Sequence, residues 1–236
     1  MSLILVRKNI ALPIAVSAFL VSISFAAFAL SLSDLTNQDA SAGLKAALEK
    51  GSAAAVAKLG VEGGFANNER VRIKLPAKLD KMRAVLQMTG QANKLDELEA
   101  SMNRAAEAAV PLAKPLLVNA VKSMTVADAK NILTGGETSV TDFFRQKTAE
   151  SLGVKFLPLV KNVTDQAKLA KKFNSVMAQA QQVGVGLDQE PTVESYVTKR
   201  ATDGLYLMIA EEEKAIRKDP IAAGSKIISK VFGALK

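Results

Sequence analysis

The chain has 236 residues and a formal net charge of +8, and it contains no histidine, cysteine or tryptophan. Without imidazole and thiol groups it cannot form a Ser-His-Asp or Cys-His nucleophile, a zinc site with nitrogen and sulfur ligands, or a disulfide. We therefore expect no metal ion and no cofactor. Any catalysis would have to use carboxylate, lysine, tyrosine or serine groups.

Residues 1–29 have the pattern of a secretory signal peptide. Two basic side chains, Arg7 and Lys8, precede an apolar stretch that ends in the small-x-small triplet Ala27-Phe28-Ala29. This pattern predicts cleavage after Ala29 and export to the periplasm. An uncleaved membrane anchor is the alternative, since about 20 apolar residues can span a bilayer. A proline and several serines within the stretch disfavour that alternative.

The remainder of the chain predicts an all-α fold. Apolar residues recur three and four positions apart from Leu44 to the end, as they do along helices that pack on a core. We expect a flexible mature N-terminus at 30–41 and then a single domain at 42–236, an irregular bundle of about eight to ten helices. The expected helices are, in chain order, 42–59, 76–90, 93–110, two helices opened by Thr125 and Ser139, 154–163, 166–183, 192–218 and 221–235.

Two breaks in the helical pattern shape this expectation. The segment 71–75 alternates apolar and basic residues with the two-residue period of a strand, and we expect a short extended connector there. Pro111 and Pro115 are expected to bend or break the chain after the third helix, because proline lacks an N–H group and clashes with the preceding turn.

Three segments of the chain resemble a known family. They are residues 102–111 (MNRAAEAAVP), 124–135 (MTVADAKNILTG) and 203–220 (DGLYLMIAEEEKAIRKDP). These segments are similar to the signature segments of the bacterial domain-of-unknown-function family 4197, and the similarity covers about residues 32–233. The resemblance implies an exported, all-helical protein, and it brings no activity, cofactor or catalytic residue with it.

Polar residues at core-facing positions predict one internal cluster. On the helix that follows Thr192, the apolar stripe reaches Glu212, and burying a carboxylate is costly unless a cation or donors lie opposite. Glu107 lies among alanines in the helix 93–110, with Asn103 and Arg104 on its face. The cluster of these four residues would either bind a polar ligand group or form a buried ion-pair network that locks two helices in register.

The other charged residues of the last long helix are expected on the surface. Glu213 and Arg217 have the four-residue spacing of a favourable surface pair, which contributes only a few tenths of a kcal/mol. Glu211, Lys214 and Lys218 are expected in the same kind of pair.

The C-terminal segment 221–236 is predicted to be an amphipathic helix. Its apolar face would either dock against the bundle or, with its basic edge, lie on an anionic membrane surface. The residues of this face and edge are Lys226, Ile227, Ile228, Lys230, Val231, Phe232 and Leu235.

These features favour a non-enzymatic protein of the cell envelope. We expect it to bind an envelope protein or an amphiphilic ligand through its helix faces. We expect no nucleic-acid partner, because the lysines between 161 and 172 have no aromatic side chains interleaved for base stacking.

The alternative is a carboxylate-dependent hydrolase or lyase that acts on cell-wall polymer. Its acid would be Glu107, Glu212 or Glu194. Glu194-Ser195, together with Gly204-Leu205, faintly resembles motifs of lytic transglycosylases, although Leu207 stands where those enzymes have glutamine.

Overall fold

The structure is a computed structural model that describes residues 32–81, 83–88, 90, 92–127, 129–182 and 192–236. The predicted signal peptide, residues 1–29, lies outside the described residues. The described part is all-α without strands, which confirms the predicted fold class. Its elements are η1 (Leu32–Asp34), α1 (Asn37–Leu59), α2 (Ala77–Asp80), α3 (Arg83–Met88), α4 (Asn93–Ser123), α5 (Ala129–Leu133), α6 (Ser139–Gln166), α7 (Leu169–Gln182), α8 (Val193–Lys218) and α9 (Lys226–Gly233).

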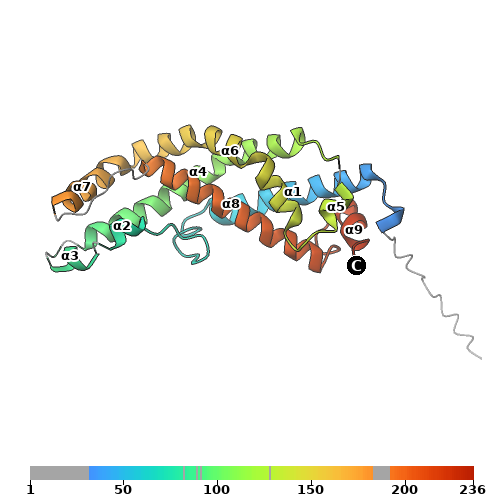
Figure 1. The fold of residues 1–236 in the computed structure, drawn as a ribbon, viewed down its shortest axis with the longest axis horizontal. Helices are drawn as coiled ribbons and strands as arrows, with labels where there is room; N and C mark the ends of the chain where they lie inside the picture. The colour runs from blue at the N-terminus through green and yellow to red at the C-terminus, as the bar shows by residue number, and fades with distance from the viewer. Residues whose placement is uncertain (1–31, 82, 89, 91, 128, 183–191) are drawn as a thin grey trace, which may run out of the picture.

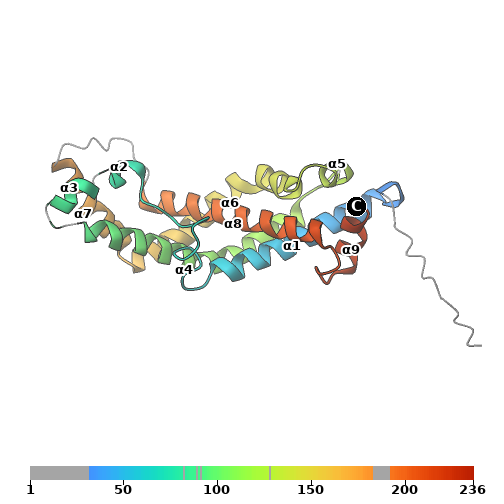
Figure 2. The same ribbon diagram turned by 90° about the horizontal axis from the view of Figure 1, so that it is seen from below.

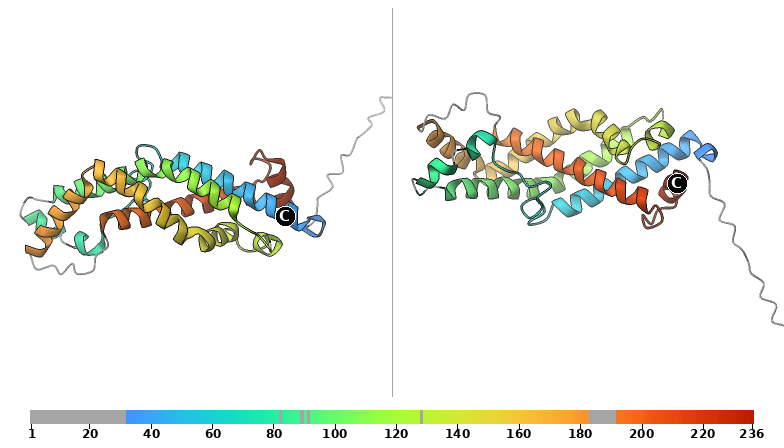
Figure 3. Two further views of the ribbon diagram at one scale, coloured as in Figure 1. Left: turned by 90° about the horizontal axis from the view of Figure 1, so that it is seen from above. Right: turned by 60° about the horizontal axis from the view of Figure 1, so that its bottom comes forward.

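Four long helices form an elongated bundle (Figure 1). Helix α8 packs on α1 and α6, and α4 packs on the same two helices. Helices α2, α3 and α7 lie together at one end of the bundle, whereas α9 and the C-terminus lie near the start of α1 at the other end (Figure 2, Figure 3). No described helix combines the length and the apolar character that crossing a membrane requires.

The expected break at the two prolines is wrong, because α4 continues through Pro111 and Pro115. Both prolines lie on the exposed side of the helix, where solvent can hydrate the carbonyl groups that they leave without an amide donor. The ring of Pro111 packs against Gly60, and a Cβ on Gly60 would lie 2.8 Å from the Pro111 Cγ atom. Close approach at a glycine thus accommodates the proline ring.

Several other boundaries differ from the expected ones. Helix α1 begins at Asn37, inside the segment expected to be flexible, because the Thr36 hydroxyl caps it by accepting a hydrogen bond from the Asp39 N–H at 3.0 Å. The expected helix 76–90 is divided into α2 and α3, and α6 runs through the break expected before residue 154. The C-terminal helix is shorter than expected, since α9 covers only Lys226–Gly233.

The predicted connector is confirmed as an extended segment. Val71, Ile73 and Leu75 are buried against the bundle, whereas Arg72 and Lys74 are exposed. Alternation therefore produces one apolar face and one basic face, as the two-residue period of extended backbone requires.

Candidate functional site

The four residues of the predicted polar cluster lie in separate arrangements. Arg104 is exposed on α4. Glu212 keeps 17% of its side chain exposed and accepts an ion-pair hydrogen bond from the Lys58 ammonium group of α1. Asn103 and Glu107 are buried, and both bind the segment between α1 and α2. The prediction of one internal cluster is therefore corrected to a surface ion pair and a pair of loop anchors.

Glu107 and Asn103 fix the backbone of that segment from α4. The Glu107 Oε1 atom accepts hydrogen bonds from the N–H groups of Phe65 and Ala66, each at 3.0 Å. The Asn103 side chain accepts from the Ile73 N–H and donates to the Ile73 carbonyl oxygen, each at 2.9 Å. These bonds satisfy polar groups that would otherwise be buried without partners.

Glu213 and Arg217 form the predicted ion pair, but the prediction that this pair lies on the surface is wrong. Glu213 is only 3% exposed, and its carboxylate accepts hydrogen bonds from the Val140 and Thr141 N–H groups at the start of α6. Arg217 donates to Glu213 at 2.8 Å and to the Leu133 carbonyl oxygen at 2.9 Å. The pair thus joins α8 to α5 and α6, because a carboxylate at a helix N-terminus satisfies free N–H groups and complements the helix dipole.

The apolar face of α9 is docked on the bundle. Ile228, Val231 and Phe232 are each at most 1% exposed. Val231 packs on Gly43 of α1 so closely that a Cβ on Gly43 would lie 2.5 Å from the Val231 side chain. Lys230 pairs with Asp39 at 2.9 Å. Of the two interpretations of the C-terminal helix, the structure therefore favours docking, since these side chains are not free to enter a membrane. Lys226 is exposed, and Ile227 and Leu235 are half-buried.

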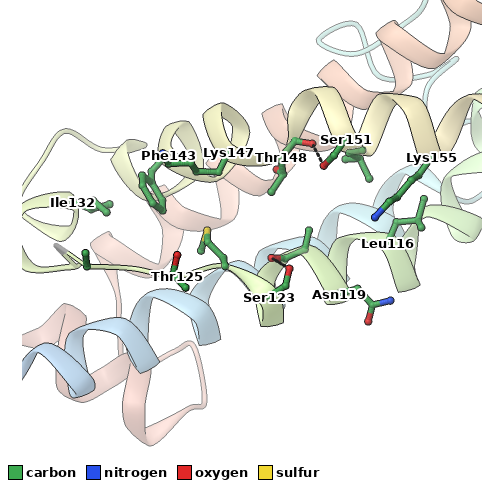
Figure 4. A pocket seen from close by; sticks show the side chains of 14 residues that line it. Leu116, Asn119, Ser123, Thr125, Ile132, Phe143, Lys147, Thr148, Ser151 and Lys155 are labelled. Atoms are coloured by element: carbon green, nitrogen blue, oxygen red, sulfur yellow. Dashed lines mark hydrogen bonds between the residues drawn. The ribbon is translucent and has the colours of Figure 1, made fainter.

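A groove of about 770 Å³ lies between the C-terminal part of α4, the loop 124–127 and α6 (Figure 4). Side chains of α4 and α6 line its opposite sides, and Lys155 extends from α6 toward α4. The apolar residues of the lining are Leu116, Ala120, Met124, Ala127, Ile132, Phe143 and Leu152.

The charged residues that the structure describes in this groove are all basic. Among the described residues, Lys147 and Lys155 line it with no acidic residue, and neither lysine has a carboxylate partner there. The Lys147 ammonium group lies 5.8 Å from the centre of the Phe143 ring, a cation–π contact. The groove therefore combines apolar walls with positive charge that no described carboxylate neutralises.

The hydroxyl groups of the lining are mostly engaged by the protein itself. Thr148 donates to the Phe144 carbonyl oxygen at 2.6 Å and shares a 2.7 Å hydrogen bond with the Tyr206 hydroxyl. Ser151 donates to the Thr148 carbonyl oxygen at 3.2 Å. The lysines are thus the polar groups of this lining that remain best suited to a ligand.

Sequence reasoning missed Lys147 and Lys155, although a signal was present. Lys147, Ser151 and Lys155 are four residues apart and form a polar stripe on one helix face. The stripe alone does not reveal the apolar wall opposite, which α4 supplies from a distant part of the sequence.

The predicted acids of the hydrolase alternative lie elsewhere. None of Glu107, Glu194 and Glu212 lines this groove, and Glu107 has its Oε1 atom occupied by two backbone donors. Within the described residues no group of three or more acidic side chains is arranged to hold a metal ion.

Comparison with known families gives a match over most of the chain. The model of a family described as "Protein of unknown function (DUF4197)" matches residues 34–233, which is most of the chain. This confirms the family resemblance predicted from the three segments. No curated protein and no solved structure matches the chain.

Proposed function

Because the chain belongs to the DUF4197 family of proteins of unknown function, we propose its function from its own geometry: it is an exported envelope protein that binds an anionic amphiphile in the groove between α4 and α6. The ligand class is a molecule with one apolar chain and one carboxylate or similar anionic head. The role is binding, without a chemical step.

The observation that supports this proposal most directly is the makeup of the groove. Its volume of about 770 Å³ falls in the range typical of small-molecule sites. Apolar side chains and two lysines share one concave surface, and among the described residues no carboxylate pairs with these lysines or lines the groove. This combination is complementary to a ligand that is itself apolar at one end and negative at the other.

The two parts of the ligand would be held by different forces. The apolar chain would lie against Leu116, Met124 and Leu152 and gain about 25 cal/mol for each Å² removed from water. The anionic head would accept charge-assisted hydrogen bonds from Lys147 and Lys155, which are stronger than neutral hydrogen bonds. The lysines would set the orientation of the chain in the groove.

Export to the periplasm is part of the same proposal. The basic and apolar segments of residues 1–29 support it, and an envelope location would give the protein access to lipids and their breakdown products. Mass spectrometry of protein recovered from the native host would test cleavage, with Leu30 expected as the first residue. A chain that retains Arg7 and Lys8 would contradict it.

Titration calorimetry with laurate and its neutral analogue lauramide tests ligand binding. We expect the protein beginning at Leu30 to bind laurate with one-to-one stoichiometry. The double substitution Lys147→Gln with Lys155→Gln should weaken laurate binding roughly tenfold, because two charge-assisted contacts are lost. Lauramide binding should be the same for both proteins.

A matched double variant controls for net charge. Lys50→Gln with Lys226→Gln removes two exposed lysines outside the groove, and laurate should bind it as it binds the unmodified protein. The proposal fails if laurate does not bind saturably or if both double variants lose the same affinity.

A further inference from the structure

A second cavity, of about 740 Å³, lies between the connector, α8 and α6. Among the described residues, its lining includes five basic side chains and one acidic side chain, Asp203. The basic residues are Arg70, Arg72, Lys74, Arg145 and Arg200. We call this cavity the arginine groove. It shares no lining residue with the groove between α4 and α6.

The buried anchors on α4 determine how the connector presents its charges. Asn103 binds both the N–H and the carbonyl oxygen of Ile73, and Ile73 is fully buried. Since side chains alternate along extended backbone, Arg72 and Lys74 on either side of Ile73 point outward. Asn103, one of the four residues of the predicted polar cluster, therefore positions the backbone that carries Arg72 and Lys74 at the edge of the arginine groove.

Three of the five basic residues are already engaged by carboxylates. Arg70 pairs with Glu211 and Arg72 pairs with Glu99, each at 2.9 Å. Arg145 pairs with Asp203, which also receives a hydrogen bond from Lys199 at 3.1 Å. These ion pairs hold the arginines in place, and exposed pairs of this kind contribute little to stability.

Lys74 and Arg200 differ from the other three. Within the described part of the chain, neither has a carboxylate partner. Both are connected through Tyr196: the Arg200 guanidinium lies 5.1 Å from the centre of the Tyr196 ring, and the Tyr196 hydroxyl donates to the Lys74 carbonyl oxygen at 2.9 Å. Tyr196 thus positions the Arg200 guanidinium and the backbone of Lys74 at one cavity, and neither cation has a carboxylate partner among the described residues.

We propose that the arginine groove binds the phosphate group of a ligand, with Lys74 and Arg200 as its direct contacts. A planar guanidinium presents two parallel N–H donors that match phosphate oxygens, and lysine adds a compact positive charge. Arg145 lines the same groove, but its charge is balanced by Asp203, so Lys74 and Arg200 supply the positive charge for the phosphate. The phosphate belongs either to a soluble molecule or to the headgroup of a lipid.

Calorimetric titration with inorganic pyrophosphate and binding to vesicles distinguish these two sources. Vesicles of phosphatidylcholine with phosphatidic acid are compared with vesicles of phosphatidylcholine alone. Saturable pyrophosphate binding without vesicle binding supports a soluble phosphate ligand, and binding to the acidic vesicles supports a headgroup. Saturable binding to neither probe overturns the proposal.

The double substitution Lys74→Gln with Arg200→Gln tests the assigned contacts. Both side chains are exposed, so we expect the variant to keep the melting temperature of the unmodified protein. Its affinity for the probe that binds should fall roughly tenfold or more, because two charge-assisted contacts are lost. Lys50→Gln with Lys114→Gln, which removes two exposed positive charges outside both grooves, should bind that probe with unchanged affinity. Equal loss in both double variants would indicate attraction to net charge alone and would overturn the assignment.

Discussion

Glu107 and Glu213 are buried carboxylates that each accept hydrogen bonds from two backbone N–H groups. The sequence pattern identified Glu107 as unusual because small residues surround it, but it placed Glu212 rather than Glu213 toward the core. Neighbouring positions on a helix differ by only about 100° in direction. A modest error in the predicted orientation of α8 about its axis is therefore enough to assign the buried position to the wrong glutamate. The packing of α8 on α6 determines that Glu213 is the buried one.

Tyr206 makes the stability of the fold decrease as the pH rises through the alkaline range. It is 2% exposed and shares a hydrogen bond with Thr148, and burial raises the pKa of its hydroxyl above the usual 10.0. The folded state therefore favours the neutral phenol. This contribution is intact below about pH 10 and is lost as the pH rises toward the higher pKa of the folded state.

Thermal unfolding between pH 8 and pH 11 of the unmodified protein and Tyr206→Phe measures this effect. At pH 8 the substitution should cost about 1 kcal/mol, since one hydrogen bond is lost while Thr148 keeps its bond to the Phe144 carbonyl oxygen. Above pH 10 the difference between the two proteins should shrink. A difference that stays constant up to pH 11 would contradict the prediction.

The connector between α1 and α2 shows what local pattern reveals about an element and what it omits. The alternation of residues 71–75 predicted extended backbone correctly, because every second side chain is apolar. The side chain that anchors it, Asn103, lies 30 residues away from Ile73. Neither that partner nor the basic groove that results is encoded in the pattern of the connector itself.

Replacing Asn103 should loosen the connector. Asn103→Ala leaves the N–H and carbonyl groups of Ile73 buried without partners, at a cost of about 2 kcal/mol or more. Brief digestion with trypsin, followed by mass spectrometry, should show faster cleavage after Arg70, Arg72 and Lys74.

The matched control is Asn119→Ala, which replaces an exposed asparagine of the same helix. Cleavage at the three connector sites should be as slow in this variant as in the unmodified protein. Equal rates in Asn103→Ala and the control would show that Asn103 does not hold the connector.

At the scale of the whole molecule, periodicity predicted that the chain is helical and approximately where most helices lie. It did not predict which helices meet. Both grooves are formed by segments distant in sequence. Lys155 on α6 and Arg200 on α8 become part of a groove only when these helices pack against other elements. Long-range packing thus separates the part of the architecture that was predictable from the sites that were not.

Deleting residues 221–236 tests whether α9 is an integral part of the bundle. Ile228, Val231 and Phe232 are fully buried, and each such side chain contributes about 1.5 to 3 kcal/mol. Because a domain of ordinary stability has only about 5 to 15 kcal/mol in total, the truncated protein should melt at a much lower temperature and aggregate. Circular dichroism and light scattering measure both properties. A soluble truncated protein that melts like the full chain and no longer binds anionic vesicles would instead support membrane contact by α9.

The prolines of α4 have a consequence for motion. Pro111 and Pro115 cannot donate to the carbonyl groups of Glu107 and Pro111, so two successive turns of the helix each lack one hydrogen bond. The turns of α4 after Pro115, which form the wall of the groove facing α6, are therefore held to the preceding turns by fewer backbone hydrogen bonds. Local opening should begin there, and amide protons of 116–123 should exchange with deuterium sooner than those of 98–106.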